Sequence, residues 1–130
     1  MRVTKSFEFD ASHLLPMYNG KCSHLHGHRW TLHVSVVGGI QTSGPFIGMV
    51  MDFNVLSQLM IPIINKLDHN HLNDLLMNPT CENLLIYIAG LACTCGLKWD
   101  TLYLMESPGC LCELTREEYE TLYAENEADQ

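Results

Sequence analysis

The sequence has little positive charge: 7 Lys and Arg stand against 15 Asp and Glu, for a formal net charge of −8 at pH 7. Binding to DNA or RNA depends on cationic side chains that displace the counterions of the phosphates. The composition therefore argues against a nucleic-acid-binding protein, although a small anionic substrate is still possible. Many of the acidic residues lie near the C-terminus, and we expect residues 115–130 to be a solvated acidic tail without chemistry.

Long apolar runs are also missing. No stretch has the length of a transmembrane helix or of the apolar part of a signal peptide, so we expect a cytoplasmic protein that does not bind membranes. The cytosol is reducing, and the 6 cysteines are therefore better interpreted as thiols or metal ligands than as disulfides. Residues 1–114 suit a single domain with one small core. A deep site in such a domain needs walls from another subunit, which predicts a homo-oligomer.

Several segments alternate apolar and polar residues, which is the pattern of half-buried strands. These segments are residues 6–13, 26–36, 46–53, 101–106 and 110–114. Apolar residues at helical spacing predict one helix after Asp52 or Asn54 and a second from about Thr80 to Gly96. The resulting order β, β, β, α, α, β, β predicts an α+β domain, in which both helices cover one face of a mainly antiparallel sheet.

Three histidines are placed so that their side chains can converge. His26 and His28 are two apart on a predicted strand and share a face, and His13 ends the apolar face of a neighbouring strand. Three histidines suit a catalytic Zn²⁺, because the fourth position stays open for water or substrate. Iron, cobalt or nickel would also accept imidazoles. The alternative is that these side chains only form hydrogen bonds in the core, but one shared ion would satisfy them together.

Two further features predict catalysis beside such a metal. Cys22 lies four residues before His26, where a dication would favour its thiolate as a base or nucleophile. Cys22 is alternatively a fourth ligand, which would close the site and make the protein a zinc-stabilised binding module. Asp68 next to His69 can orient the imidazole and raise its basicity, although simple helix capping is a common role for such a pair. Cys22 with His69 would also suit a metal-independent thiol hydrolase.

An acidic residue and four cysteines complete the candidates. Glu106 ends a strand on its buried face, where it is either a salt-bridged strand end or an anchor for two N–H groups of a flat heterocycle. The Cys93-x-Cys95 and Cys110-x-Cys112 pairs invite a four-thiolate zinc interpretation. We reject it, because residues two apart on a helix do not share a face, and interpret these cysteines as packing thiols.

Taken in order, these motifs resemble the 6-pyruvoyl-tetrahydropterin synthase superfamily over about residues 5–112, and specifically its 6-carboxy-tetrahydropterin synthase branch. The motifs are Phe9-Asp10-Ala11-Ser12-His13, Cys22-x-x-x-His26-Gly27-His28, Asp52-Phe53, Leu67-Asp68-His69, Leu72-Asn73-Asp74, Pro79-Thr80-x-Glu82 and Glu106. The gap of three residues between Cys22 and His26 resembles the carboxy branch more than the animal-type pyruvoyl branch.

The resemblance implies a tunnelling fold, in which three subunits join their sheets into a barrel and two trimers stack as a hexamer with active sites between subunits. It implies that zinc binds His13, His26 and His28. Cys22 and the Asp68–His69 pair would be catalytic, Glu106 would anchor the pterin, and Thr80, Cys81 and Glu82 would line its pocket.

The implied substrate is 7,8-dihydroneopterin triphosphate. In the carboxy branch the products are 6-carboxy-5,6,7,8-tetrahydropterin, acetaldehyde and triphosphate, for 7-deazaguanine synthesis. In the pyruvoyl branch triphosphate leaves without loss of carbon. The sequence has no evident cluster of basic residues for binding the triphosphate, and Lys21 and Arg29 are the only candidates for that role.

Overall fold

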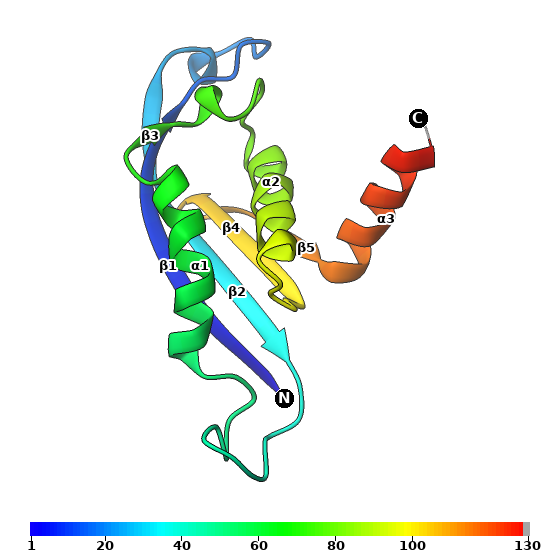
Figure 1. Cartoon of the computed structure of the whole chain (residues 1–130). Coiled ribbons are helices and arrows are strands. Elements are labelled where there is room, and N and C mark those ends of the chain that lie inside the picture. Colours follow the sequence, from blue (N-terminus) through cyan, green and yellow to red (C-terminus); the bar gives the residue numbers. More distant parts are fainter. Residues whose placement is uncertain (129–130) are drawn as a thin grey trace.

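A five-stranded sheet with helices α1 and α2 on one face forms the body of the computed structural model, which describes residues 1–128 (Figure 1). The sheet order is β3-β1-β2-β4-β5. The strands are β1 (Arg2–His13), β2 (His26–Val37), β3 (Asn70–His71), β4 (Thr101–Ser107) and β5 (Cys110–Thr115). The α-helices are α1 (Phe53–Leu67), α2 (Cys81–Thr94) and α3 (Arg116–Ala128), and short 3₁₀ turns span Lys21–Ser23 and Leu72–Asp74. The predicted α+β class is confirmed.

The long antiparallel pair β1–β2 determines which side chains face the helices. Its register places Phe9 opposite Trp30 and His13 opposite His26, and alternate residues on both strands are buried. The Phe9 and Trp30 rings stack with centroids 6.0 Å apart in the core under α1 and α2. The three histidines therefore lie on the same face of the sheet as the apolar core residues, at the end of the sheet where the apolar residues stop.

Helices α1 and α2 begin where the sequence predicts. The Asn54 backbone N–H donates to the Asp52 side chain at 3.0 Å, which caps α1, and the Asn83 N–H donates to the Thr80 hydroxyl at 3.1 Å, which caps α2. After α2 the chain turns at Gly96, whose φ of 84° is unfavourable for residues with a Cβ.

The predicted strand at residues 46–53 is wrong. Gly44 and Gly48 take positive φ angles of 83° and 84°, and the Gly48 N–H donates to the Gln41 carbonyl at 2.8 Å, so this segment curls into a local loop. The neighbour of β2 on that side is β4 instead. A two-residue strand, β3, runs parallel to β1, which makes the sheet mixed rather than purely antiparallel.

Most of the expected acidic tail forms a third helix, α3, which projects away from the sheet in Figure 1. Its base is attached to the domain through Trp99: the Arg116 guanidinium lies 5.0 Å from the Trp99 ring, and the Tyr119 ring contacts it edge-on. Residues 129–130 lie outside the described residues. None of the described helices has both the length and the apolar character needed to span a membrane.

Candidate metal centre and active site

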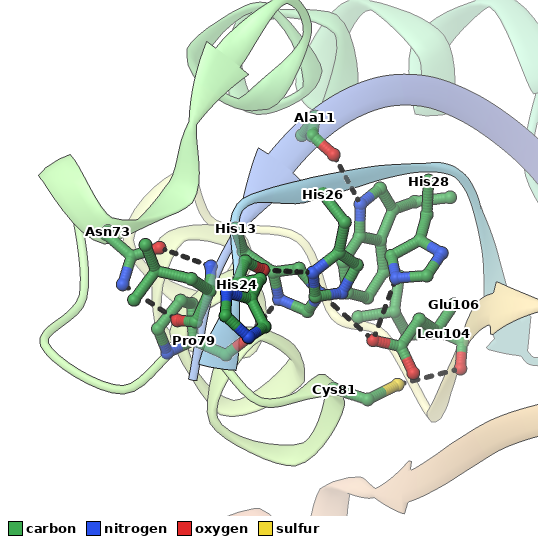
Figure 2. Close-up of polar contacts among 12 residues, drawn as sticks. Ala11, His13, His24, His26, His28, Asn73, Pro79, Cys81, Leu104 and Glu106 are labelled. Atoms are coloured by element: carbon green, nitrogen blue, oxygen red, sulfur yellow. Dashed lines mark hydrogen bonds and ion pairs between the residues drawn. The ribbon is translucent and has the colours of Figure 1, made fainter. Parts of the chain in front are cut away.

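The three predicted histidines converge at one end of the sheet, as Figure 2 shows. The ring centroids of His13 and His26 are 4.6 Å apart, those of His26 and His28 are 4.9 Å apart, and those of His13 and His28 are 5.2 Å apart. Trp30 lies behind them, with its ring edge-on to His13 and His28 and its indole N–H donated to the Ala11 carbonyl at 3.3 Å. This wall holds the imidazoles in place.

Backbone carbonyls determine which ring nitrogens of the histidines face the centre. The Nδ1 atom of His13 lies 2.8 Å from the Pro79 carbonyl, and that of His26 lies 2.7 Å from the His24 carbonyl. A carbonyl oxygen can only accept, so each Nδ1 donates its hydrogen. In a neutral imidazole this leaves Nε2 with a free lone pair, which is the orientation that metal-binding histidines adopt.

The electrostatics of the site favour neutral rings. Burial lowers the pKa of both His13 and His28 from the ordinary value and outweighs the Pro79 carbonyl beside His13 and the Glu106 carboxylate, which act in the opposite direction. The Nε2 atoms of His13 and His28 are buried, yet neither has a hydrogen-bond partner. A buried nitrogen lone pair without a partner is costly, and a metal ion would remove that cost for both.

Glu106, at the end of β4, joins the same cluster. Its Oε1 atom lies 3.2 Å from His13 Nε2 and 3.4 Å from His28 Nε2 (Figure 2). The donor atoms of the three histidines and Glu106 all lie within 4.8 Å of one another, so this His/Glu group fits a metal ion. Three imidazoles and a carboxylate suit Zn²⁺, and the carboxylate is close enough either to bind the ion or to meet a substrate beside it.

Asn73 binds the backbone next to His13, a role that the sequence pattern does not predict. Its side-chain amide donates to the Leu14 carbonyl and accepts from the Leu14 N–H, both at 2.9 Å. This pair of bonds ties the 3₁₀ turn Leu72–Asp74 to the residue that follows His13. Asn73 belongs to the Leu72-Asn73-Asp74 motif, but only the fold shows that its side chain binds the Leu14 backbone.

The Asp68–His69 pair forms one hydrogen-bonded unit at the end of β1. His69 Nδ1 lies 2.9 Å from Asp68 Oδ2, while Asp68 Oδ1 accepts the Asp10 N–H at 2.9 Å. The Asp10 N–H and then the His69 ring lower the pKa of Asp68. His69 also lines an open groove of about 620 Å³, which His28 borders but the other members of the histidine cluster do not.

Cys22 lies in the 3₁₀ turn Lys21–Ser23, between β1 and β2, where its carbonyl accepts the Leu15 N–H at 2.8 Å. Its side chain is partly buried. Within residues 1–128, Cys22 does not belong to the group of donors that could share an ion with His26; Glu106 takes that place. The geometry therefore gives no support to Cys22 as a fourth ligand.

The predicted pocket residues Thr80, Cys81 and Glu82 open helix α2. The Cys81 thiol points toward the end of β4, where it donates to the Leu104 carbonyl at 3.4 Å beside Glu106 (Figure 2). Thr80 uses its hydroxyl as the helix cap.

The four cysteines of the rejected thiolate site do not converge in the described part of the chain. Cys93 and Cys112 are partly buried and pack against the core, in agreement with their interpretation as packing thiols. Cys95 and Cys110 are exposed, so that interpretation is wrong for them. The thiol nearest to Cys112 is that of Cys81, a contact that no sequence pattern predicts.

The chain matches a family model described as 6-pyruvoyl tetrahydropterin synthase over residues 2–117. It is 43% identical over 90 residues to the 6-carboxy-5,6,7,8-tetrahydropterin synthase of Synechocystis sp., covering 66% of this chain and 70% of the relative. It is 35% identical over 88 residues to the dihydroneopterin monophosphate aldolase of Pyrococcus furiosus, covering 68% of this chain and 71% of the relative. The 6-pyruvoyl tetrahydropterin synthase of Caenorhabditis elegans shares the fold, with a TM-score of 0.78 at 21% identity, over 88% of this chain and 94% of that one.

We expect the metal-free protein to lose thermal stability as the pH falls from about 7.5 to about 5.5. Burial holds the pKa of His13 and His28 below the ordinary value, so at intermediate pH the unfolded chain binds more protons than the folded one. Their contribution is complete above the unfolded pKa of about 6.5 and is lost as the pH falls toward the lower folded pKa. In EDTA and over this pH range, we expect the Tm of the wild-type protein to fall by a few degrees more than the Tm of the His28→Gln variant. Equal decreases in the two proteins would contradict this explanation.

Proposed function

Because the chain belongs to the 6-pyruvoyl tetrahydropterin synthase family, we propose that it is an enzyme of the 6-carboxy-5,6,7,8-tetrahydropterin synthase type. The reaction would convert 7,8-dihydroneopterin triphosphate to 6-carboxy-5,6,7,8-tetrahydropterin, acetaldehyde and triphosphate. The observation that carries the proposal is the convergence of three histidine side chains and the Glu106 carboxylate, whose donor atoms all lie within 4.8 Å of one another. The relative with 43% identity carries the name of this activity.

His13, His26 and His28 would hold the metal ion, which we propose is Zn²⁺. A bound Zn²⁺ acts as a Lewis acid and would make the hydroxyl groups of the substrate side chain more acidic. The protein's own contribution to binding the ion is orientation, because the carbonyls of Pro79 and His24 keep the two Nδ1–H groups turned away from it.

Proton transfer would be divided between two sets of residues. Asp68 holds the His69 ring through Nδ1, which leaves His69 Nε2 free to take or return a proton on the groove side. Cys22 would act from the loop that enters β2, as a second group that moves protons between side chain and ring. The groove that His69 borders is open, so a second copy of the chain would be needed to enclose the substrate, in agreement with a homo-oligomer.

Glu106 would accept two N–H groups of the pterin ring, and we expect Glu106→Gln to raise the KM about 10- to 100-fold. An amide presents one acceptor oxygen and a donor that would face a substrate N–H. Because three histidines suffice to bind the ion, the bound zinc per chain should not change. The matched control is Glu113→Gln, because Glu113 is an exposed residue of β5. This variant should have the KM of the wild-type protein. If zinc is lost from Glu106→Gln, the carboxylate is a metal ligand and this assignment is wrong.

Product analysis tests the reaction directly. The zinc-loaded protein is incubated with 7,8-dihydroneopterin triphosphate, and the pterin products are identified by mass spectrometry together with an assay for acetaldehyde. Carboxy-tetrahydropterin with acetaldehyde supports the proposal, whereas pyruvoyl-tetrahydropterin would assign the chain to the other branch. No turnover by metal-replete protein would contradict both.

A second candidate follows from the relative in Pyrococcus furiosus, which is named as an aldolase of dihydroneopterin monophosphate. Its identity of 35% over 71% of its length shows that this scaffold is similar to one with a different named substrate. The scarcity of basic residues for a triphosphate also favours a substrate with less negative charge. Parallel incubations with dihydroneopterin monophosphate therefore belong in the same assay, and a higher kcat/KM for the monophosphate would favour the aldolase.

A further inference from the structure

Cys81 and Cys112 form a thiol pair that the proposed reaction does not use. Their Sγ atoms lie 3.1 Å apart, although Cys81 begins helix α2 and Cys112 lies in β5 opposite Leu104. A disulfide bond is about 2.05 Å long, so a small movement of the two side chains would bring the sulfurs to bonding distance. In residues 1–128, the other cysteine sulfurs have no such thiol neighbour.

We propose that Cys81 and Cys112 are a reversible oxidation site, at which a small-molecule disulfide converts the two thiols to an intramolecular disulfide. The Cys112 thiolate attacks one sulfur of the oxidant and releases the first small thiol. The Cys81 sulfur then loses its proton, attacks the Cys112 sulfur and releases the second small thiol. Two electrons pass from the cysteines to the oxidant, which leaves as two thiols, and the protein retains one S–S bond.

The surroundings assign the attacking role to Cys112. The contact with the Cys81 sulfur lowers the pKa of Cys112, while the same contact, together with burial, raises the pKa of Cys81. Cys112 also borders a small groove of about 160 Å³, which gives an oxidant access to its sulfur. Glu82 and Glu113 line this groove, so a cationic disulfide should react faster than an anionic one.

The bond would fix the first turn of α2 to β5. Pro79, two residues before Cys81, supplies the carbonyl that orients His13, so this attachment lies next to the metal cluster. A disulfide between residues 31 apart stabilises mainly by restricting the unfolded chain. We expect oxidation to raise the Tm by about 10 °C.

The test measures thiols directly and does not depend on the proposed reaction. The zinc-loaded protein is treated with cystamine or with oxidised glutathione, quenched with acid, alkylated and examined by intact mass and peptide mapping. We expect two of the 6 thiols to be protected from alkylation, one crosslinked peptide joining Cys81 to Cys112, and full reversal by dithiothreitol. Cystamine should act faster than oxidised glutathione.

Matched variants separate this pair from general thiol oxidation. Cys110→Ser removes an exposed thiol of the same strand and should leave the crosslink intact. Cys81→Ser and Cys112→Ser should form no intramolecular disulfide under the same conditions. The proposal is wrong if the wild-type protein keeps all thiols free, carries only mixed disulfides with the reagent, or links a different pair. The peptide map of the wild-type protein decides this even if one variant does not fold.

Discussion

Replacing His28 by Gln should remove the bound metal ion and lower turnover by about 1000-fold, since a Lewis acid supplies several kcal/mol to such a reaction. Gln keeps a polar side chain of similar reach but offers no imidazole lone pair. His28 contributes one of the two buried Nε2 atoms without a hydrogen-bond partner, and its ring is mostly shielded between Trp30 and the other histidines. The measurements are zinc per chain by elemental analysis and the visible spectrum of the Co²⁺-substituted protein.

His33→Gln is the matched control for this loss. His33 lies on the same strand, β2, but an odd number of residues away from His28, so it occupies the opposite face, where its ring contacts Tyr103. This variant should bind zinc with the wild-type stoichiometry and keep its activity. Retention of a full equivalent of zinc and of the cobalt spectrum by His28→Gln would show that the metal binds elsewhere.

The sequence alone predicted the histidine cluster, because strand periodicity is local and strong. Two histidines two residues apart on a strand must share a face, and the antiparallel pairing of β1 with β2 then brings His13 opposite His26. The helix caps at Asp52 and Thr80 were predicted for the same reason: each depends on residues within three positions along the chain.

Features that depend on long-range pairing were missed. The contact of Glu106 with the histidines depends on the register of β4, which pairs Met105 with Thr31 and carries Glu106 beyond the last paired residue. Cys81 and Cys112 meet only because α2 packs over β5. The wrong strand at residues 46–53 has a local cause, since its apolar alternation includes Gly48, whose left-handed conformation ends an extended segment.

Replacing Cys22 by Ala should lower turnover by about 100- to 10,000-fold while the zinc content and the Tm stay close to those of the wild type. Cys22 lies outside the group of donors within 4.8 Å that includes Glu106, so its removal leaves the proposed metal ligands intact. Its partly buried side chain sits in a short 3₁₀ turn, where loss of a sulfur atom opens little core volume. The matched control is Cys110→Ala, which removes an exposed thiol and should leave turnover unchanged.

The three outcomes of this experiment correspond to the three functions that the sequence left open. Loss of turnover with zinc retained means that Cys22 moves protons in a metal-dependent enzyme. Loss of zinc together with the fold would instead make Cys22 a structural ligand, in conflict with the donor group that Glu106 completes. Activity that depends on Cys22 but survives removal of all metal would identify a thiol hydrolase with His69 as its base. That last result would leave His13 and His28 with two buried nitrogen atoms that lack a hydrogen-bond partner and no function to account for them.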